Sequence, residues 1–142
     1  MAIDDNQFAF EEAFNLLCGT MLGEGCYRKV FACRVDPTLV VKVEAKTDSF
    51  ANVGEYEFWE SYCKEPCAKW LAPCVALSGY GRVLLQKRVE PLQKGQLPER
   101  VPSFLSDLKL SNFGMFEGRI VCCDYGLLTW SPAMRMRKAN WD

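Results

Sequence analysis

The amino-acid sequence predicts an α+β fold in which most strands pair in an antiparallel way. Strand-like runs rich in β-branched and apolar residues recur along the chain, and short turns separate several of them. Two other stretches, near 5–17 and 49–63, place apolar residues at helical spacing. With 142 residues, of which 49% are hydrophobic and 25% charged, the chain can form one domain with its own core.

The first part of the chain predicts two helices with two or three strands between them. The expected elements are a helix at 5–17, strands at 26–34 and 38–44, and a helix from 48 or 49 to about 63. Asp5 can cap the first helix, and Asp36-Pro37 forms a tight turn between the strands. Residues 20–24 lead into a turn before the first strand, and Pro66 prevents continuation of the second helix.

The second part predicts hairpins joined by a linker. The expected elements are strands at 74–77 and 82–89, a polar linker at 90–102 with at most one helical turn, a helical turn at 103–107, and a hairpin of strands at 113–116 and 119–123. Ser78-Gly79-Tyr80-Gly81 and Glu117-Gly118 supply the two hairpin turns. The tail at 127–142 can form a packing helix or strand, and its large apolar residues are Trp130, Met134, Met136 and Trp141.

Composition and charge exclude several classes of function. The net charge is -1, so we expect no strongly basic face and no nucleic-acid partner; the Arg135, Arg137 and Lys138 cluster fits exposed tail charges. The absence of histidine excludes histidine-based acid–base catalysis, catalytic triads and histidine metal ligands. No secretory signal is visible, and no apolar run approaches the ~20 residues of a membrane helix, so we expect a cytoplasmic protein outside the membrane.

The eight cysteines have two interpretations. In a reducing cytoplasm they are expected to be free thiols that fill the core. Cys122 and Cys123 are adjacent in a predicted strand and should therefore point to opposite faces. Cys63, Cys67 and Cys74 can contribute to a zinc site instead, although their spacing matches no common zinc pattern.

Four stretches contain residues that can act together on a phosphorylated ligand. They are Leu22-Gly23-Glu24-Gly25, the apolar strand around Lys42, the helical stretch containing Glu55 and Glu57, and Asp107-Leu108-Lys109-Leu110-Ser111-Asn112 followed by Asp124-Tyr125-Gly126. Glycines let the backbone approach phosphates closely, and a lysine in an apolar strand needs an acidic partner when it is buried. The predicted helix follows the lysine strand and supplies such an acid.

Each stretch also has a simpler structural interpretation. A turn that needs positive φ explains Gly23 and Gly25, Lys42 can face solvent, and the helix acids can form an exposed face. Asp and Asn often cap turns. Asn112 and Asp124, however, flank a predicted hairpin, so their side chains can converge, and their oxygens suit a hard cation such as magnesium.

In this order, the stretches resemble the signature motifs of the protein kinase superfamily, of the eukaryotic Ser/Thr type, over about residues 20–126. The matching segments are Gly23-x-Gly25-x-x-Arg28-x-Val30 for the Gly-rich loop, Val41-Lys42-Val43 for the Val-Ala-Ile-Lys strand, Asp107-Leu108-Lys109-x-x-Asn112 for the catalytic loop, and Asp124-Tyr125-Gly126 for Asp-Phe-Gly. The resemblance implies one minimal kinase-like domain at 1–142. Residues 1–90 would form a small-lobe antiparallel sheet with one main helix, and residues 91–142 a reduced catalytic segment and tail.

The resemblance also implies ATP and magnesium as cofactors and a role for each residue. Nucleotide-binding residues would be Gly23, Gly25, Val30, Lys42, Glu55, Gln86 near the gatekeeper position, and Val89 at the hinge. Lys42 would hold the α- and β-phosphates, and Glu55, or Glu57 as the alternative, would hold Lys42. Asn112 and Asp124 would bind magnesium. Asp107 would orient the acceptor hydroxyl, and Lys109 would offset charge on the transferred phosphoryl group.

The sequence departs from the kinase pattern in several places. Arg28 replaces the third glycine of the loop, where it can restrict nucleotide entry or contact phosphate, and Leu105-Ser106 replaces the usual His-Arg. The intervals at 90–106 and 127–142 are too short for the helical substrate-binding lobe, and no Ala-Pro-Glu motif is present. The apolar residues of the tail, or a partner, would have to cover the core that this lobe normally covers.

Two functions therefore remain open. The first is an ATP- and magnesium-binding kinase-like protein that acts as a phosphotransferase to Ser/Thr of a protein substrate. The alternative is a catalytically inactive kinase-like interaction protein, or pseudokinase, that binds and modulates a host or cellular protein. A viral effector in the host cytoplasm is one example. An unrelated α+β fold is the third interpretation, and the sequence indicates no particular oligomeric state.

Overall fold

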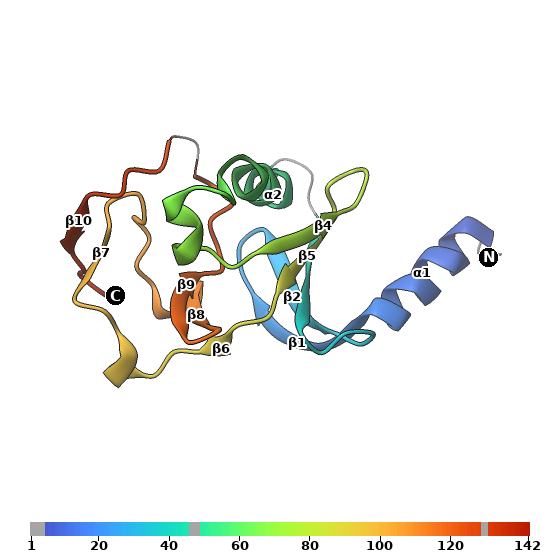
Figure 1. The fold of residues 1–142 in the computed structure, drawn as a ribbon. Coiled ribbons are helices and arrows are strands. Elements are labelled where there is room, and N and C mark those ends of the chain that lie inside the picture. The colour runs from blue at the N-terminus through green and yellow to red at the C-terminus, as the bar shows by residue number, and fades with distance from the viewer. Residues whose placement is uncertain (1–4, 46–48, 129–130) are drawn as a thin grey trace.

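The computed structural model describes residues 5–45, 49–128 and 131–142 and confirms the α+β class with mainly antiparallel sheets (Figure 1). The helices are α1 (Asp5–Leu17) and α2 (Ala51–Tyr62), with short 3-10 helices η1 (Pro66–Trp70), η2 (Lys94–Gln96) and η3 (Leu110–Asn112). The strands are β1 (Cys18–Glu24), β2 (Arg28–Cys33), β3 (Leu39–Glu44), β4 (Cys74–Leu77), β5 (Val83–Lys87), β6 (Glu90–Pro91), β7 (Arg100–Pro102), β8 (Phe113–Phe116), β9 (Arg119–Cys122) and β10 (Met136–Lys138). No described helix is long and apolar enough to cross a membrane.

A five-stranded antiparallel sheet in the order β1-β2-β3-β5-β4 forms the larger half of the molecule (Figure 1). β3 lies at its centre, where its β-branched run is buried. Side chains of β3 alternate between the two faces of the sheet. Lys42 and Glu44 reach α2 on one face, whereas Leu39 and Val41 join a small apolar cluster on the other.

The α2 helix is capped by a strand residue rather than by its own N-cap. Phe50 at the N-cap has φ 53° and makes no side-chain capping hydrogen bond. Instead, the Glu44 carboxylate accepts hydrogen bonds from the backbone amides of Ala51, at 3.1 Å, and Asn52, at 3.0 Å, and from the Ser49 hydroxyl. The first free amides of α2 are thus satisfied, and the helix is tied to β3, which contains Lys42.

The main hydrophobic core joins α2 to the C-terminal part of the chain. Its buried members include Phe58 of α2, Phe113 of β8 and Tyr125. Trp141 packs edge-on against Phe113 with ring centroids 4.9 Å apart, and Met134 also contacts this core. The tail therefore covers the core as expected for Met134 and Trp141, whereas Met136 is 38% exposed in β10, and Trp130 lies outside the described residues.

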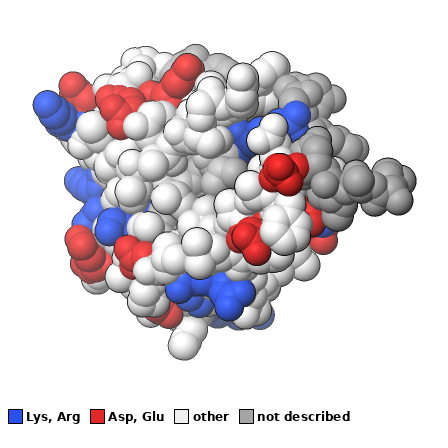
Figure 2. Space-filling model, turned by 90° about the vertical axis from the view of Figure 1, so that its right-hand side faces the viewer, with Lys and Arg blue, Asp and Glu red and all other residues white. Residues whose placement is uncertain are grey.

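The α1 helix packs on the sheet only through its C-terminal end. Phe14 meets Phe31 of β2 in an edge-to-face contact at 5.5 Å, and Leu17 joins the same apolar cluster. None of the helix residues is buried, and α1 extends away from the sheet in Figure 1. On the face that Figure 2 shows, Lys and Arg are interspersed with Asp and Glu, which agrees with the near-neutral net charge.

Most of the predicted elements are present, and four predictions need correction. Residues 18–24 form strand β1 rather than only an approach to a turn, because they pair with β2. Residues 103–107 form no helix; the helical turn is η3, at Leu110–Asn112. The linker at 90–102 contains the short strands β6 and β7 besides one helical turn, and the tail forms strand β10, which pairs with β7. The second helix begins at Ala51, and Asp48 lies outside the described residues.

Candidate functional site

Four segments that are distant in the sequence meet around the carboxylate of Glu55. This side chain is fully buried on the sheet-facing side of α2. It accepts five hydrogen bonds from four residues of β2, β3, β5 and the segment after β9: two from the terminal nitrogens of Arg28 and one each from Lys42, Gln86 and the backbone amide of Tyr125. A buried carboxylate is tolerated only with such partners, so Glu55 is the centre of the polar cluster.

Lys42 and Glu55 form the ion pair that the sequence predicted. The Lys42 Nζ lies 2.5 Å from Oε1 of Glu55 and also donates to the carbonyl oxygen of Cys123. Lys42 is 4% exposed, so the solvent-facing interpretation of this lysine is wrong. Glu57, the alternative partner, is exposed on the other side of α2, which leaves Glu55 as the partner of Lys42.

Arg28 bridges Glu55 to Asp124. Its guanidinium makes two hydrogen bonds of 3.1 Å to the Glu55 carboxylate and one of 2.7 Å to Oδ1 of Asp124. A fourth, of 3.2 Å, reaches Oδ1 of Asn52. The arginine is 8% exposed although it opens a strand next to a surface turn. The residue that replaces the third glycine of the loop is therefore part of the cluster rather than a surface group.

Asp124, Tyr125 and Gly126 follow β9 and lie against α2. The Tyr125 amide donates to Oε2 of Glu55 at 2.8 Å, and its hydroxyl donates to the Ala72 carbonyl at 2.7 Å. Gly126 lies so close to α2 that a Cβ on Gly54 would clash with its carbonyl oxygen. Backbone approaches backbone here, and this explains why a helix contains glycine at position 54.

Asn112 bonds to Cys123, the residue before Asp124, whereas the side chains of Asp107 and Lys109 are exposed. The Asn112 carbonyl accepts from the Cys123 amide at 2.8 Å, and its side-chain amide donates to the Asp107 carbonyl at 3.2 Å. The side chains of Asp107 and Lys109 are 60% and 62% exposed, and they lie 4.0 Å from each other. Among the described residues, neither side chain makes a salt bridge to Glu55 or Asp124.

The remaining predicted residues lie on the strands around the cluster. Gly23 and Val30 are register partners of β1 and β2, and Val30 is opposite Lys42 in β3. The Gly25 amide donates to the Arg28 carbonyl at 2.9 Å, which closes the turn and brings Arg28 inward. Gln86 and Val89 are the remaining residues of the predicted nucleotide-binding set.

Gln86 belongs to the cluster, whereas Val89 lies at its edge. The Gln86 side-chain amide donates to Oε1 of Glu55 at 3.1 Å, and its fully buried Oε1 finds no hydrogen-bond partner among the described residues. Val89 follows β5 and packs against Gly114 of β8, so it joins the large sheet to the small sheet β6-β8-β9.

Neighbouring charges hold the cluster in its ionised form. Burial by itself raises the pKa of Glu55, but the charges and hydrogen bonds of Lys42 and Arg28 outweigh it and hold the pKa below its usual range. Burial likewise lowers the pKa of Arg28, and Glu55 and Asp124 together raise it above its ordinary value. Two cations and two carboxylates thus balance one another.

Sequence reasoning missed two contributors to this site. Asn52, one turn before Glu55 on the same face of α2, accepts from Arg28 and donates to the Lys42 carbonyl at 3.1 Å. The spacing of three residues was a usable signal, because such residues share a helix face. The hydrogen bond from the Tyr125 amide had no sequence signal, since it depends on how β9 meets α2.

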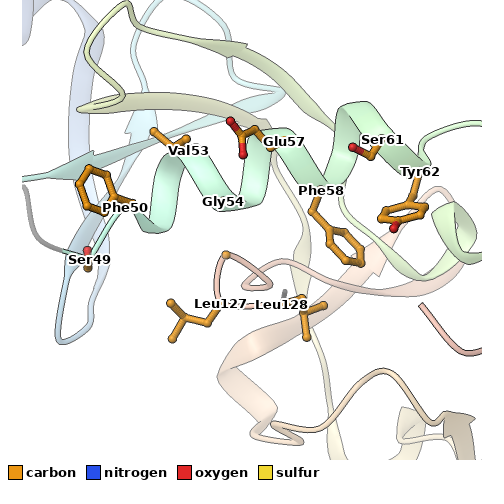
Figure 3. Close-up of a pocket in the computed structure, with 11 residues that line it drawn as sticks. Ser49, Phe50, Val53, Gly54, Glu57, Phe58, Ser61, Tyr62, Leu127 and Leu128 are labelled. Carbon is orange, nitrogen blue, oxygen red and sulfur yellow. The ribbon is translucent and has the colours of Figure 1, made fainter. Parts of the chain in front are cut away.

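A pocket of about 500 Å³ lies on the other side of α2 (Figure 3). The segment Gly126–Leu128 runs beneath the helix, and Phe58 points toward Leu128. Neither Lys42 nor Asp124 lines this pocket. It is therefore distinct from the charged cluster, although both adjoin the segment that begins at Asp124.

The cysteines are free thiols, but not all of them fill the core as expected: Cys63 and Cys123 are partly buried, and Cys26 is exposed. Among the described residues, no group of three or more Cys, Asp and Glu side chains is placed to hold a metal ion. The zinc interpretation of Cys63, Cys67 and Cys74 thus receives no support. A magnesium site of the kind predicted would use one carboxylate and one amide, with phosphate and water oxygens as the other ligands. No family model matches the chain, and no curated protein matches it.

Proposed function

We propose that the chain is a minimal kinase-like protein that binds ATP with magnesium. The observation that supports this proposal best is the Lys42–Glu55 ion pair at 2.5 Å, with Asp124 joined to the same carboxylate through Arg28. Residues from β3, α2 and the segment after β9 meet at this carboxylate, and their order along the chain is the order of the kinase motifs that they resemble.

Each residue of the cluster would have one task. Glu55 would fix the Lys42 ammonium so that it meets the α- and β-phosphates without a loss of side-chain freedom on binding. Backbone amides of the turn at Gly23 and Gly25 would face the phosphates. Gln86 and Val89, at the end of β5 and just beyond it, would adjoin the base.

The donor set fits magnesium in chemical type. Asp124 is 54% exposed, so its carboxylate can reach a ligand from the solvent side, and Asn112 is held next to Cys123. Carboxylate and amide oxygens are hard donors. When bound, magnesium would neutralise phosphate charge. Phosphotransfer to a Ser/Thr hydroxyl would further need Asp107 to orient the acceptor and Lys109 to offset charge, and both side chains are open to an incoming protein substrate.

The second candidate is a kinase-like interaction protein without catalysis, and Arg28 favours it. The Arg28 guanidinium forms a salt bridge of 2.7 Å to Oδ1 of Asp124, so the charges of the site are balanced by its own side chains. The chain after Asp124 pairs β10 with β7 and covers the core, and it adds no helix among the described residues. A substrate-binding platform would then have to come from a partner.

Thermal unfolding with and without Mg-ATP separates the two candidates. A ligand at 100 times its Kd stabilises the native state by about 2.7 kcal/mol, so binding raises the Tm measurably. We expect such a rise for the wild type and its loss in Lys42→Met. Lys87→Met, on a neighbouring strand, is the matched control and should keep it. A flat response of a folded wild-type protein at millimolar Mg-ATP would exclude the first candidate and leave the second.

Turnover is tested separately from binding. Transfer of label from γ-labelled ATP to a protein acceptor should disappear in Asp107→Asn while the thermal shift remains, because Asp107 would act on the acceptor rather than on the nucleotide. Equal transfer by the wild type and by Asp124→Ala would identify a contaminating kinase and exclude phosphotransfer by this chain.

A further inference from the structure

The side chain of Arg28 occupies the space between the two acids of the site. It opens β2, and the hydrogen bond from the Gly25 amide to its carbonyl fixes the turn that leads into it. Its guanidinium contacts Glu55 through two bonds and Asp124 through one, and no other basic side chain makes a salt bridge to both acids among the described residues. Only a planar, forked cation can bridge two carboxylates in this way.

The charged side chains of the site neutralise one another without a metal ion. Lys42 and Arg28 contribute two positive charges, and Glu55 and Asp124 contribute two negative ones. A divalent cation bound at Asp124 would lie next to the guanidinium, where two like charges at hydrogen-bonding separation repel strongly. Arg28 and a divalent cation therefore cannot both hold the same Asp124 oxygen.

We propose that Arg28 is the resident cation of this site and that it competes with magnesium for Asp124. This inference rests on the proposed function, because it concerns how the same site admits nucleotide and metal. Arg28 bonds Oδ1 of Asp124, and a metal ion on either oxygen of that carboxylate would lie beside the guanidinium, so the repulsion between the two cations drives Arg28 away from Asp124 when a metal ion binds there. Until then the site has a fixed positive charge in the place where a divalent cation would otherwise be required, so the nucleotide affinity of the wild type depends only weakly on metal.

A variant without the guanidinium should remain folded. In Arg28→Gln the Glu55 carboxylate keeps its bonds to Lys42, to Gln86 and to the Tyr125 amide. Asp124 is 54% exposed and can be solvated once it loses Arg28. Lys29→Gln is the matched control, because Lys29 is the next residue, has the same charge and pairs only with the exposed Glu24 at 4.0 Å.

The test measures the Kd for ATP by calorimetry in excess magnesium and again in excess EDTA. The Kd in EDTA divided by the Kd in magnesium reports how strongly ATP binding depends on the metal. Relative to wild type, we expect the ratio to rise about tenfold or more in Arg28→Gln, since a repelling charge has left the metal position. The Lys29→Gln ratio should stay at the wild-type value, and Asp124→Asn introduced into Arg28→Gln should reverse the rise.

The outcomes distinguish failure of the proposed competition between Arg28 and magnesium from failure of the proposed ATP binding. If wild type and Arg28→Gln both bind Mg-ATP with equal ratios, the competition is refuted and the proposed function stands. If neither binds ATP in any buffer, the proposed function fails, and its failure is seen in the wild type alone. A rise of the same size in Lys29→Gln would show a general effect of charge and would refute a specific role for Arg28.

A second measurement needs no variant at this position. In the wild type, the terminal Nη–H groups of Arg28 are buried and bonded to Glu55, Asn52 and Asp124, so their signals in a nitrogen-labelled sample should exchange slowly with water. Addition of Mg-ATP should shift these signals and speed their exchange, because the side chain leaves Asp124. An unchanged Arg28 signal in a sample that binds Mg-ATP would overturn the competition, even where Arg28→Gln fails to fold.

Discussion

The backbone amide of Tyr125 donates a hydrogen bond of 2.8 Å to Oε2 of Glu55, which lies 70 positions earlier in the chain. This bond joins the segment after β9 to the buried face of α2. It places Asp124 at the cluster whether or not any ligand is present. A main-chain contact thus holds the two acids near each other, in addition to the side-chain bonds that Arg28 makes to both.

Removal of the Glu55 carboxylate should destabilise the fold severely. Glu55→Ala leaves two buried cations and a buried amide without their acceptor, and loss of one partner of a buried ion pair typically costs about 3–5 kcal/mol. Urea unfolding followed by circular dichroism measures the change. Glu57→Ala, two positions along and exposed, should stay within about 0.5 kcal/mol of wild type. Similar losses for the two variants would contradict the central position of Glu55.

Stability should fall in acid because of Glu55. Its folded pKa lies below the unfolded value of about 4.3, so its contribution is fully present above that pH and is lost as pH falls through the folded pKa. Between those values one proton steepens the pH dependence of the unfolding free energy by up to about 1.4 kcal/mol per pH unit. Urea titrations from pH 6 down to pH 3 (an assay range of about three units) should show this in wild type. Glu55→Gln, if folded, should lack this component; an identical acid slope in both would refute the assignment.

Gly54→Ala should destabilise, against the usual rule for helices. Alanine in a helix interior is ordinarily favoured over glycine by about 1 kcal/mol. Here the added methyl would strike the Gly126 carbonyl, and such overpacking costs about 1–3 kcal/mol. Gly79→Ala is the control, because a Cβ at that position meets open space. Chemical denaturation measures whether the free energy of unfolding falls or rises. A Gly54→Ala protein more stable than wild type would show that α2 and Gly126 are not in contact.

The thiols should differ widely in reactivity. Cys26 is exposed in the turn between β1 and β2, whereas burial raises the pKa of Cys74 to about 12 and that of Cys123 to about 11. A chromogenic disulfide reagent at pH 8 should label Cys26 first in the native protein, and Cys26→Ser should remove that fast phase. Labelling of Cys74 at a comparable rate, located by peptide mass analysis, would contradict its burial beside Tyr125.

The sequence predicted the secondary structure best where local patterns were strong. The apolar run of β3, the helical stretch from 51 to 62 and the Glu117-Gly118 hairpin turn are all present, the last with positive φ at both residues. The sequence allowed a third strand here but did not locate β1, because its mostly exposed, mixed residues show no strand pattern and form a strand by pairing with β2. In place of the helical turn expected at 103–107, the chain makes a single hydrogen-bonded turn, from the Leu105 amide to the Pro102 carbonyl at 3.1 Å, and then continues without helix to Leu110.

For the site, the sequence by itself determined which charged residues the chain has and in what order. It also indicated that Lys42, within an apolar strand, needs an acidic partner. Tertiary structure alone decided that the partner is Glu55 rather than Glu57, because only one face of α2 meets the sheet. It also decided that Arg28 turns inward to Asp124, a contact across 96 positions that no local pattern encodes. The physical reason is that burial makes an unpaired charge costly, and only the folded chain determines which charges are buried together.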